Sequence, residues 1–188
     1  MIKIGITGSI SSGKTTASKI MSKKRGLLFS ADNEVKKLYR NDSFQKVLIK
    51  KFNIEEKSNL KNVLKKKVLT NKNNIQKLEK IIHPLVRKEM RKFSRLNKHK
   101  KTLYYEIPLL IESDLTKYFD AIIFIKARKK IRLKRFKLKG GNKKLFNIMN
   151  NRQLPDAQKI KLCDHVVVNE RNLNTLKKKL TVIINLYA

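Results

Sequence analysis

The chain has 188 residues, of which 40% are apolar, and 47 lysines and arginines stand against 14 aspartates and glutamates. This length and apolar content favour one globular domain with a real core and argue against disorder of the whole chain. No stretch is as apolar and as long as a membrane span, and Met1 leads into a strand-like segment rather than a signal peptide, so we expect a cytoplasmic location. The single cysteine, Cys163, excludes an intramolecular disulfide framework and is expected to be a small buried apolar side chain.

The formal net charge of +33 would attract any polyanion. The lysines, however, occur along nearly the whole chain rather than in one basic tail, and they are mixed with abundant asparagine and isoleucine. Because all three residues have A/T-rich codons, a biased genome explains the excess at least as well as a polyanionic partner does. Aromatic residues, at 7%, form no RNA-recognition pattern, and no zinc-finger spacing occurs. We therefore expect no specific nucleic-acid partner.

In the first half of the chain, Ile2, Ile4 and Ile6 alternate and predict a strand, which a glycine-bounded loop joins to a helix over 14–24. A second strand over 26–32 is expected to end near Ser30 and to be followed by a helix over 32–40. From 44 to 97 the pattern is helical and rich in lysine, without a convincing strand. The sequence NKNN at 71–74 predicts a break in this region, and Pro84 predicts a helix boundary.

In the second half, strands are predicted over 102–107 and 120–127, the latter apolar enough to be buried on both faces. A basic helix over 129–139, a break at 140–142 and a helix closed by Pro155 follow. A strand over 165–169 and a helix over 173–187 complete the chain. Strands that alternate with helices predict a three-layer α/β core around a parallel sheet of about five strands, with two helical insertions.

The stretch from Gly8 to Thr15 fits the pattern GxxxxGK(S/T), with a strand before it and a helix after it. Glycines allow backbone amides to approach phosphate oxygens closely, and the helix N-terminus adds partial positive charge. Lys14 would bring a positive charge to the β- and γ-phosphates, and Thr15 would offer a hydroxyl to Mg²⁺. The alternative is a Gly/Ser-rich turn without a ligand. The pattern favours a nucleotide-phosphate site, most simply for ATP.

This loop alone does not distinguish kinases from other nucleotide-binding proteins. GTPases need a guanine-reading NKxD motif, which is absent, and large ATPases need a longer chain, so a small-molecule kinase fits best. An alcohol acceptor must lose a proton and benefits from a nearby base. Asp32, just after the second predicted strand, lies where open parallel sheets place their ligands. The residues themselves leave a catalytic base and a helix N-cap equally open for Asp32.

Five stretches together resemble the dephospho-coenzyme A kinase family over nearly the whole chain: IGITGSISSGKTT, SADNEVKKL, LEKIIHPLVR, YYEIPLLIE and RQLPDAQKIKLCDHVVVNE. The resemblance implies transfer of the γ-phosphate of ATP to the ribose 3′-hydroxyl of dephospho-CoA, the last step of coenzyme A synthesis. It also implies a P-loop kinase fold with three parts. These are a nucleotide-binding core (1–32, 99–128 and 159–188), a helical CoA-binding domain (33–98) and a helical lid (129–158).

The resemblance also implies roles for individual residues. Asp32 inherits the role of base, with Lys14 and Arg135 as the other catalytic residues. The residues implied for ATP binding are Gly8, Ser9, Ile10, Ser11, Ser12, Gly13, Lys14, Thr15, Thr16 and Asn169. Those implied for acceptor binding are Asp32, His83, Arg87, Pro108, Leu109, Leu110 and Glu112. Packing is an equal alternative for Leu109 and Leu110, and a capping or packed histidine is the alternative for His83.

The chain departs from the family at several positions. Ser30 replaces the first aspartate of the family's Asp-Ala-Asp, and Glu106 replaces the usual aspartate, although with Thr15 it could still serve Mg²⁺ through water. In the lid, Arg135 matches the first of two arginines. Lys139 replaces the second and keeps its charge but loses the bidentate geometry. Met149 replaces a further arginine, for which Arg152 could compensate.

Two other functions stay open at this point. One is a kinase for a different small acceptor, such as a nucleoside monophosphate, and the other is a nucleotide-dependent protein that binds nucleic acid through its positive charge. With ATP and Mg²⁺ as cofactors, we expect ATP and dephospho-CoA as the small-molecule partners. We expect no membrane association, and a monomer or weak homo-oligomer.

Overall fold

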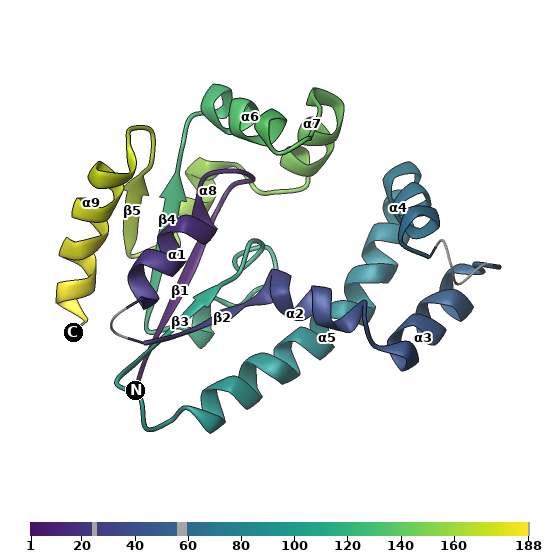
Figure 1. Ribbon diagram of the computed structural model, residues 1–188, viewed down its shortest axis with the longest axis horizontal. Coiled ribbons are helices and arrows are strands. Elements are labelled where there is room, and N and C mark those ends of the chain that lie inside the picture. Colours follow the sequence, from purple (N-terminus) through teal and green to yellow (C-terminus); the bar gives the residue numbers. More distant parts are fainter. Residues whose placement is uncertain (24–25, 56–59, 188) are drawn as a thin grey trace. The chain divides into compact units, whose positions relative to one another are not determined.

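The computed structural model describes residues 1–23, 26–55 and 60–187, and the chain divides into two compact units (Figure 1). The first unit is Met1–Ser30 with Leu96–Ala188, and the second is Ala31–Arg95. The first contains β1 (Ile2–Gly8), α1 (Lys14–Ser22), β2 (Leu27–Ser30), β3 (Thr102–Glu106), η2 (Thr116–Tyr118), β4 (Ala121–Lys126), α6 (Lys129–Leu138), α7 (Lys143–Asn151), α8 (Asp156–Ile160), β5 (His165–Val168) and α9 (Leu173–Leu186). The second contains α2 (Ala31–Leu38), α3 (Asp42–Phe52), α4 (Leu60–Thr70) and nearly all of α5 (Lys72–Leu96).

The five strands form one parallel sheet in the order β2-β3-β1-β4-β5, which confirms the α/β prediction and all five predicted strands. Glu106 of β3 pairs with both Ile6 and Ser30, while Gly8 pairs with Ile125. The carboxyl ends of the strands therefore meet at one edge of the sheet. Open parallel sheets bind ligands at this edge, because the loops that leave it converge there.

Helices α1 and α9 cover one face of the sheet (Figure 1). Isoleucines of β1 and β4 pack there against α1 and α9, in a core made of Ile4, Ile6, Ala17, Met21, Tyr104, Ile123, Ile125, Val167, Leu176, Leu180, Ile183 and Ile184. On the other face, a Cβ at Gly5 would lie 2.7 Å from Leu110 and 3.1 Å from Phe119, so the segment after β3 packs directly on β1. The sheet is thus the middle of the predicted three layers.

The second unit has its own core, which explains why α5 continues through Pro84. Proline lacks an amide hydrogen and is expected to end or kink a helix at a cost of about 3 kcal/mol, so the predicted boundary at Pro84 is wrong. Pro84 itself is exposed, while Leu78, Ile82 and Leu85 on either side of it pack into the core with Leu48. Burial of an apolar face on both sides of the proline holds the helix together.

The region between α6 and α8 also differs from the prediction. The helix expected to run to Pro155 ends at Asn151, and Pro155 instead precedes the short helix α8, which the sequence pattern did not indicate. A proline disfavours helical backbone angles at the residue before it, which here is Leu154. The amide of Leu154 donates to Oε1 of Glu112 rather than to a carbonyl of the helix. Among the described residues, no helix is long and apolar enough to cross a membrane.

Candidate active site

The loop from Gly8 to Thr15, which we call the phosphate-binding loop, leaves β1 and enters α1. Ser11 has a φ of 56° and Gly13 has a φ of 102°, both in the left-handed region. A Cβ at Gly13 would lie 2.2 Å from Nδ2 of Asn169, so only glycine fits there. Such alternation of backbone angles turns successive amides toward the inside of a loop, which makes a concave site for an anion.

Lys14 curls back over the first half of this loop. Its side chain is buried, and Nζ donates to the carbonyl oxygens of Gly8 at 2.8 Å and Ser9 at 3.1 Å. Among the residues that the structure describes, no side chain caps the N-terminus of α1, and the first turn of this helix contains no acidic residue. The positive end of the helix and the ammonium group therefore act on the same small region, and both favour a bound anion.

Glu106 lies beside the loop at the end of β3 and is only 3% exposed. Its Oε1 accepts a hydrogen bond of 2.5 Å from the hydroxyl of Thr15, and its Oε2 accepts one of 3.3 Å from Ser18. A hydroxyl and a carboxylate are hard oxygen donors of the kind that Mg²⁺ prefers. Within the described part of the chain, no cluster of three or more His, Cys, Asp or Glu could hold a metal. A cation bound here would have Thr15, Glu106 and phosphate oxygens as its ligands.

Two side chains from the second half of the chain bind one carbonyl of the loop. Nδ2 of Asn169, a buried residue just after β5, donates to the carbonyl of Ser12 at 2.8 Å. Nη1 of Arg135 on α6 donates to the same oxygen at 3.2 Å. The structure thus brings two of the residues singled out in the sequence, Asn169 and Arg135, to the loop. Lys139 and Arg152 are exposed and lie at the C-terminal ends of α6 and α7.

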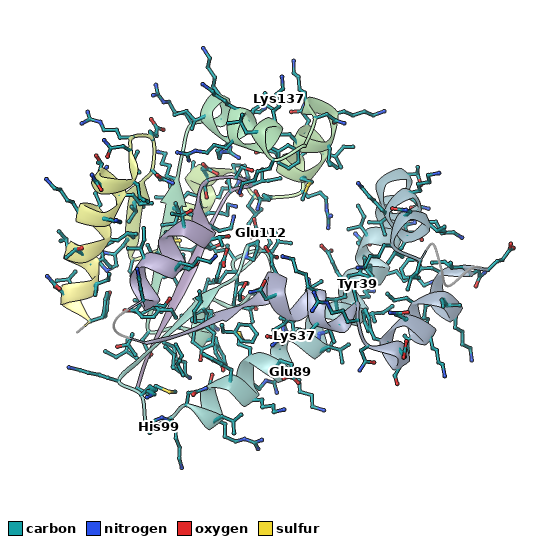
Figure 2. The ribbon with its side chains drawn as sticks, viewed as in Figure 1. Lys37, Tyr39, Glu89, His99, Glu112 and Lys137 are labelled. Carbon is teal, nitrogen blue, oxygen red and sulfur yellow. The ribbon has the colours of Figure 1, made fainter. Side chains whose placement is uncertain are left out.

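The turn after β3 is mainly held by contacts within the first unit. Leu110 is fully buried, and the carbonyl of Pro108 accepts a hydrogen bond from Thr7 at 3.2 Å. Glu112, labelled in Figure 2, accepts from the amide of Leu154 and from Nζ of Lys159, both at 3.1 Å on Oε1. Packing therefore explains the position of Leu110. One carboxylate oxygen of Glu112 is engaged in an ion pair with the fully buried Lys159.

Asp32, His83 and Arg87 belong to the second unit. Helix α2 begins at Ala31, so Asp32 is an exposed residue of its first turn and not the residue that precedes the helix. The N-cap interpretation of Asp32 is therefore wrong, although a carboxylate in the first turn still interacts favourably with the helix dipole. His83 and Arg87 are four residues apart on α5, are both half-buried, and so lie on the same face of that helix.

The structure adds residues that the sequence pattern did not indicate. Arg132 is 6% exposed and donates from Nη1 to the carbonyl of Ile10 at 3.4 Å and to Asn150 at 2.9 Å, while Nε donates to Ala127 at 3.0 Å. Burial lowers the pKa of the Arg132 guanidinium, and Asp156 opposes that shift. In a helix with lysine or arginine at most positions, nothing local distinguishes Arg132 from its solvated neighbours. Figure 2 shows nitrogen-tipped side chains on helices of both units, not gathered on one element.

The family model and the two sequence relatives described next carry the same name. The family model described as dephospho-CoA kinase matches residues 2–175. A dephospho-CoA kinase from Rickettsia typhi is 31% identical over 191 residues, covering 98% of this chain and 96% of the relative. One from Fusobacterium nucleatum is 32% identical over 180 residues, covering 94% and 93%. A crystal structure of a Thermus thermophilus protein superposes with a TM-score of 0.81 at 26% identity, covering 100% of this chain and 98% of that one.

Proposed function

Because this chain belongs to the dephospho-CoA kinase family, we propose that it transfers the γ-phosphoryl group of ATP to the ribose 3′-hydroxyl of dephospho-CoA and releases coenzyme A and ADP. The observation that carries this proposal is the family match over residues 2–175, which includes both the phosphate-binding loop and the stretches around Asp32, His83 and Glu112. Coenzyme A synthesis is expected in the cytoplasm, and we include that location in the proposal.

On the donor side, Lys14, the amides of the phosphate-binding loop and the N-terminus of α1 hold the phosphates of ATP. Thr16 and Asn169 complete the proposed ATP site, and the contact of Asn169 with the Ser12 carbonyl supports a place beside the loop. Thr15 and Glu106 are the residues that would hold Mg²⁺. When bound, the cation would neutralise charge on the phosphate oxygens.

On the acceptor side, we propose that Asp32 accepts the proton of the 3′-hydroxyl as its oxygen attacks the γ-phosphorus. The bond from the γ-phosphorus to the β–γ bridging oxygen breaks, and ADP leaves with that electron pair. His83 and Arg87 would bind the acceptor from the helical domain, 33–98, and the turn containing Pro108, Leu109 and Glu112 would bind it from the core, 1–32, 99–128 and 159–188. Leu110 would support that turn by packing.

The segment 129–158 is proposed as the lid. Its Arg135 already donates to the carbonyl of Ser12, which supports a place next to the transferred phosphoryl group. Guanidinium groups can bind phosphate through two hydrogen bonds, and such charge stabilises the transition state. Lys139 and Arg152 would add charge from the exposed ends of α6 and α7, and closure would exclude water that could otherwise hydrolyse ATP.

The test is incubation of the purified protein with ATP, Mg²⁺ and dephospho-CoA, with mass spectrometry of the product. We expect coenzyme A to form, and we expect AMP, UMP and shikimate to be phosphorylated far more slowly. If the folded protein formed no coenzyme A, or preferred one of these other acceptors, the proposal would be wrong.

A further inference from the structure

The segment between α7 and α8 contacts the phosphate-binding loop through two side chains. Oε1 of Gln153 accepts a hydrogen bond of 2.8 Å from the amide of Ile10. Oδ1 of Asp156 accepts a hydrogen bond from the hydroxyl of Ser9, whose side chain is buried. The amide of Ile10 is therefore already occupied by Gln153. The anion site would be built from the amides that follow Ile10.

The same segment is anchored at its other side. Lys159 has no exposed surface, and its Nζ lies 3.1 Å from Oε1 of Glu112 and 5.6 Å from the centre of the Phe124 ring. The amide of Leu154 donates to the same carboxylate oxygen. A buried ion pair has a large desolvation cost, and loss of either partner leaves an uncompensated charge. Glu112 therefore holds the segment at two points, Leu154 and Lys159. Asp156 lies between these two points in the chain, and Gln153 directly precedes the first.

We infer that Gln153 and Asp156 are positioning residues for ATP binding: they set the conformation of the phosphate-binding loop, and the Glu112–Lys159 ion pair holds them in place. The inference rests on the proposed function, since it concerns how the ATP site is shaped. Two direct hydrogen bonds fix consecutive residues, Ser9 and Ile10, at the point where the loop leaves β1. Preorganised amides bind an anion without first having to be ordered, so loss of these contacts weakens nucleotide binding.

The test measures binding of ADP with Mg²⁺ by isothermal titration calorimetry, without dephospho-CoA, in Asp156→Ala, Ser9→Ala and the double variant. We expect each single variant to weaken ADP binding by about 3- to 10-fold, the range for loss of one net hydrogen bond. Because both variants remove the same bond, the double variant should bind no more weakly than the weaker single variant. Gln158→Ala, an exposed position on the same helix, is the matched control and should bind as the unmodified chain does.

A conservative variant separates positioning from a loss of folding. Asp156→Asn keeps an oxygen that accepts from Ser9, so it should restore ADP affinity to within about 2-fold of the unmodified chain. In steady-state assays, Asp156→Ala should raise KM for ATP while KM for dephospho-CoA stays unchanged. Unchanged ADP binding in Asp156→Ala, additive losses in the double variant, or no rescue by Asn would each overturn the inference.

Failure of this inference is distinguishable from failure of the proposed function. If the unmodified chain forms coenzyme A but Asp156→Ala binds ADP normally, only the positioning role is wrong. If the unmodified chain binds ADP and shows the expected non-additivity but forms no coenzyme A, the positioning role is supported and the acceptor is wrong.

Discussion

The hydroxyl of Thr15 and the carboxylate of Glu106 are joined by a hydrogen bond of 2.5 Å, although 91 residues separate them in the chain. Thr15 is the last residue of the phosphate-binding loop and lies in the first turn of α1, and Glu106 ends β3, next to β1 in the sheet. The parallel register brings the two oxygens together at the carboxyl edge of the sheet. Glutamate, which is one methylene longer than the family's usual aspartate, still reaches the threonine hydroxyl.

Replacement of Glu106 should therefore change the requirement for Mg²⁺. Glu106→Gln keeps the shape but removes the charge, and we expect the Mg²⁺ concentration for half-maximal activity to rise about 10-fold or more, since a carboxylate is a better ligand than an amide. The measurement is coenzyme A formation as a function of Mg²⁺ at saturating ATP. Thr15→Ser, which keeps the hydroxyl, is the control and should change this requirement little. An unchanged Mg²⁺ requirement in Glu106→Gln would argue against a cation at this position.

Replacement of Asp32 tests the proposed base. Asp32→Asn should lower kcat by about 10²- to 10⁴-fold, the usual contribution of general base catalysis, while ADP affinity stays unchanged. Glu34→Gln on the same helix is the control, because Glu34 pairs at 2.8 Å with Lys37, whose side chain is 70% exposed (Lys37 is labelled in Figure 2), and such surface pairs contribute little. A fully active Asp32→Asn variant would remove Asp32 from the mechanism without affecting the assignment of the substrate.

The buried ion pair of Glu112 and Lys159 predicts an asymmetric effect on stability. Lys159→Met leaves a carboxylate without its cation and should lower the free energy of unfolding by about 3–5 kcal/mol. Adding Glu112→Gln removes that charge while keeping an oxygen for the Leu154 amide, so the double variant should recover most of the loss. Urea unfolding followed by circular dichroism measures both values. Equal stabilities of the single and double variants would contradict this account.

Cys163 should react slowly with alkylating reagents. Burial, followed by the nearby charge of Asp164, raises the pKa of this thiol from its ordinary value of 9.0 to about 11. The thiolate is the reactive form, so alkylation by iodoacetamide at pH 8 should be about 100-fold slower than in urea-unfolded protein, where the pKa is ordinary. A folded-state pKa above the unfolded one also means that this thiol's contribution to stability is lost as pH rises from about 9 to 11. Equal alkylation rates in folded and unfolded protein would show that the thiol is not shielded.

Pro84 should destabilise the helix in which it lies. Pro84→Ala restores a backbone donor within α5, and we expect the free energy of unfolding to rise by about 1–3 kcal/mol, because proline in a helix interior is unfavourable by about 3 kcal/mol relative to alanine. Pro108→Ala, outside any helix, is a suitable comparison and should give no such gain. A decrease in stability for Pro84→Ala would mean that the proline ring packs favourably enough to outweigh the missing hydrogen bond.

Local patterns were sufficient for the elements whose signal lies within a few residues. The alternation of Ile2, Ile4 and Ile6 indicated β1, and the apolar run before Ala127 indicated a strand buried on both faces. Where contacts between distant residues determine the ends of a helix, prediction from local sequence patterns failed. Pro84 lies inside a helix because apolar residues on both sides of it are buried, and the end of α7 was misplaced where Leu154 donates to Glu112, 42 residues earlier in the chain.

The sequence by itself determined the class of fold, the phosphate-binding loop and the family resemblance, because strand and helix periodicity and the glycine spacing of a phosphate nest are local properties. Only the tertiary structure decided how side chains from distant parts of the chain contact that loop. Glu106, Asn169, Asp156 and Gln153 come from parts of the chain 91 to 157 residues away from their partners, and Arg132 looks like any other cation of a basic helix. Such contacts depend on strand order and register, which bring distant side chains to one edge of the sheet.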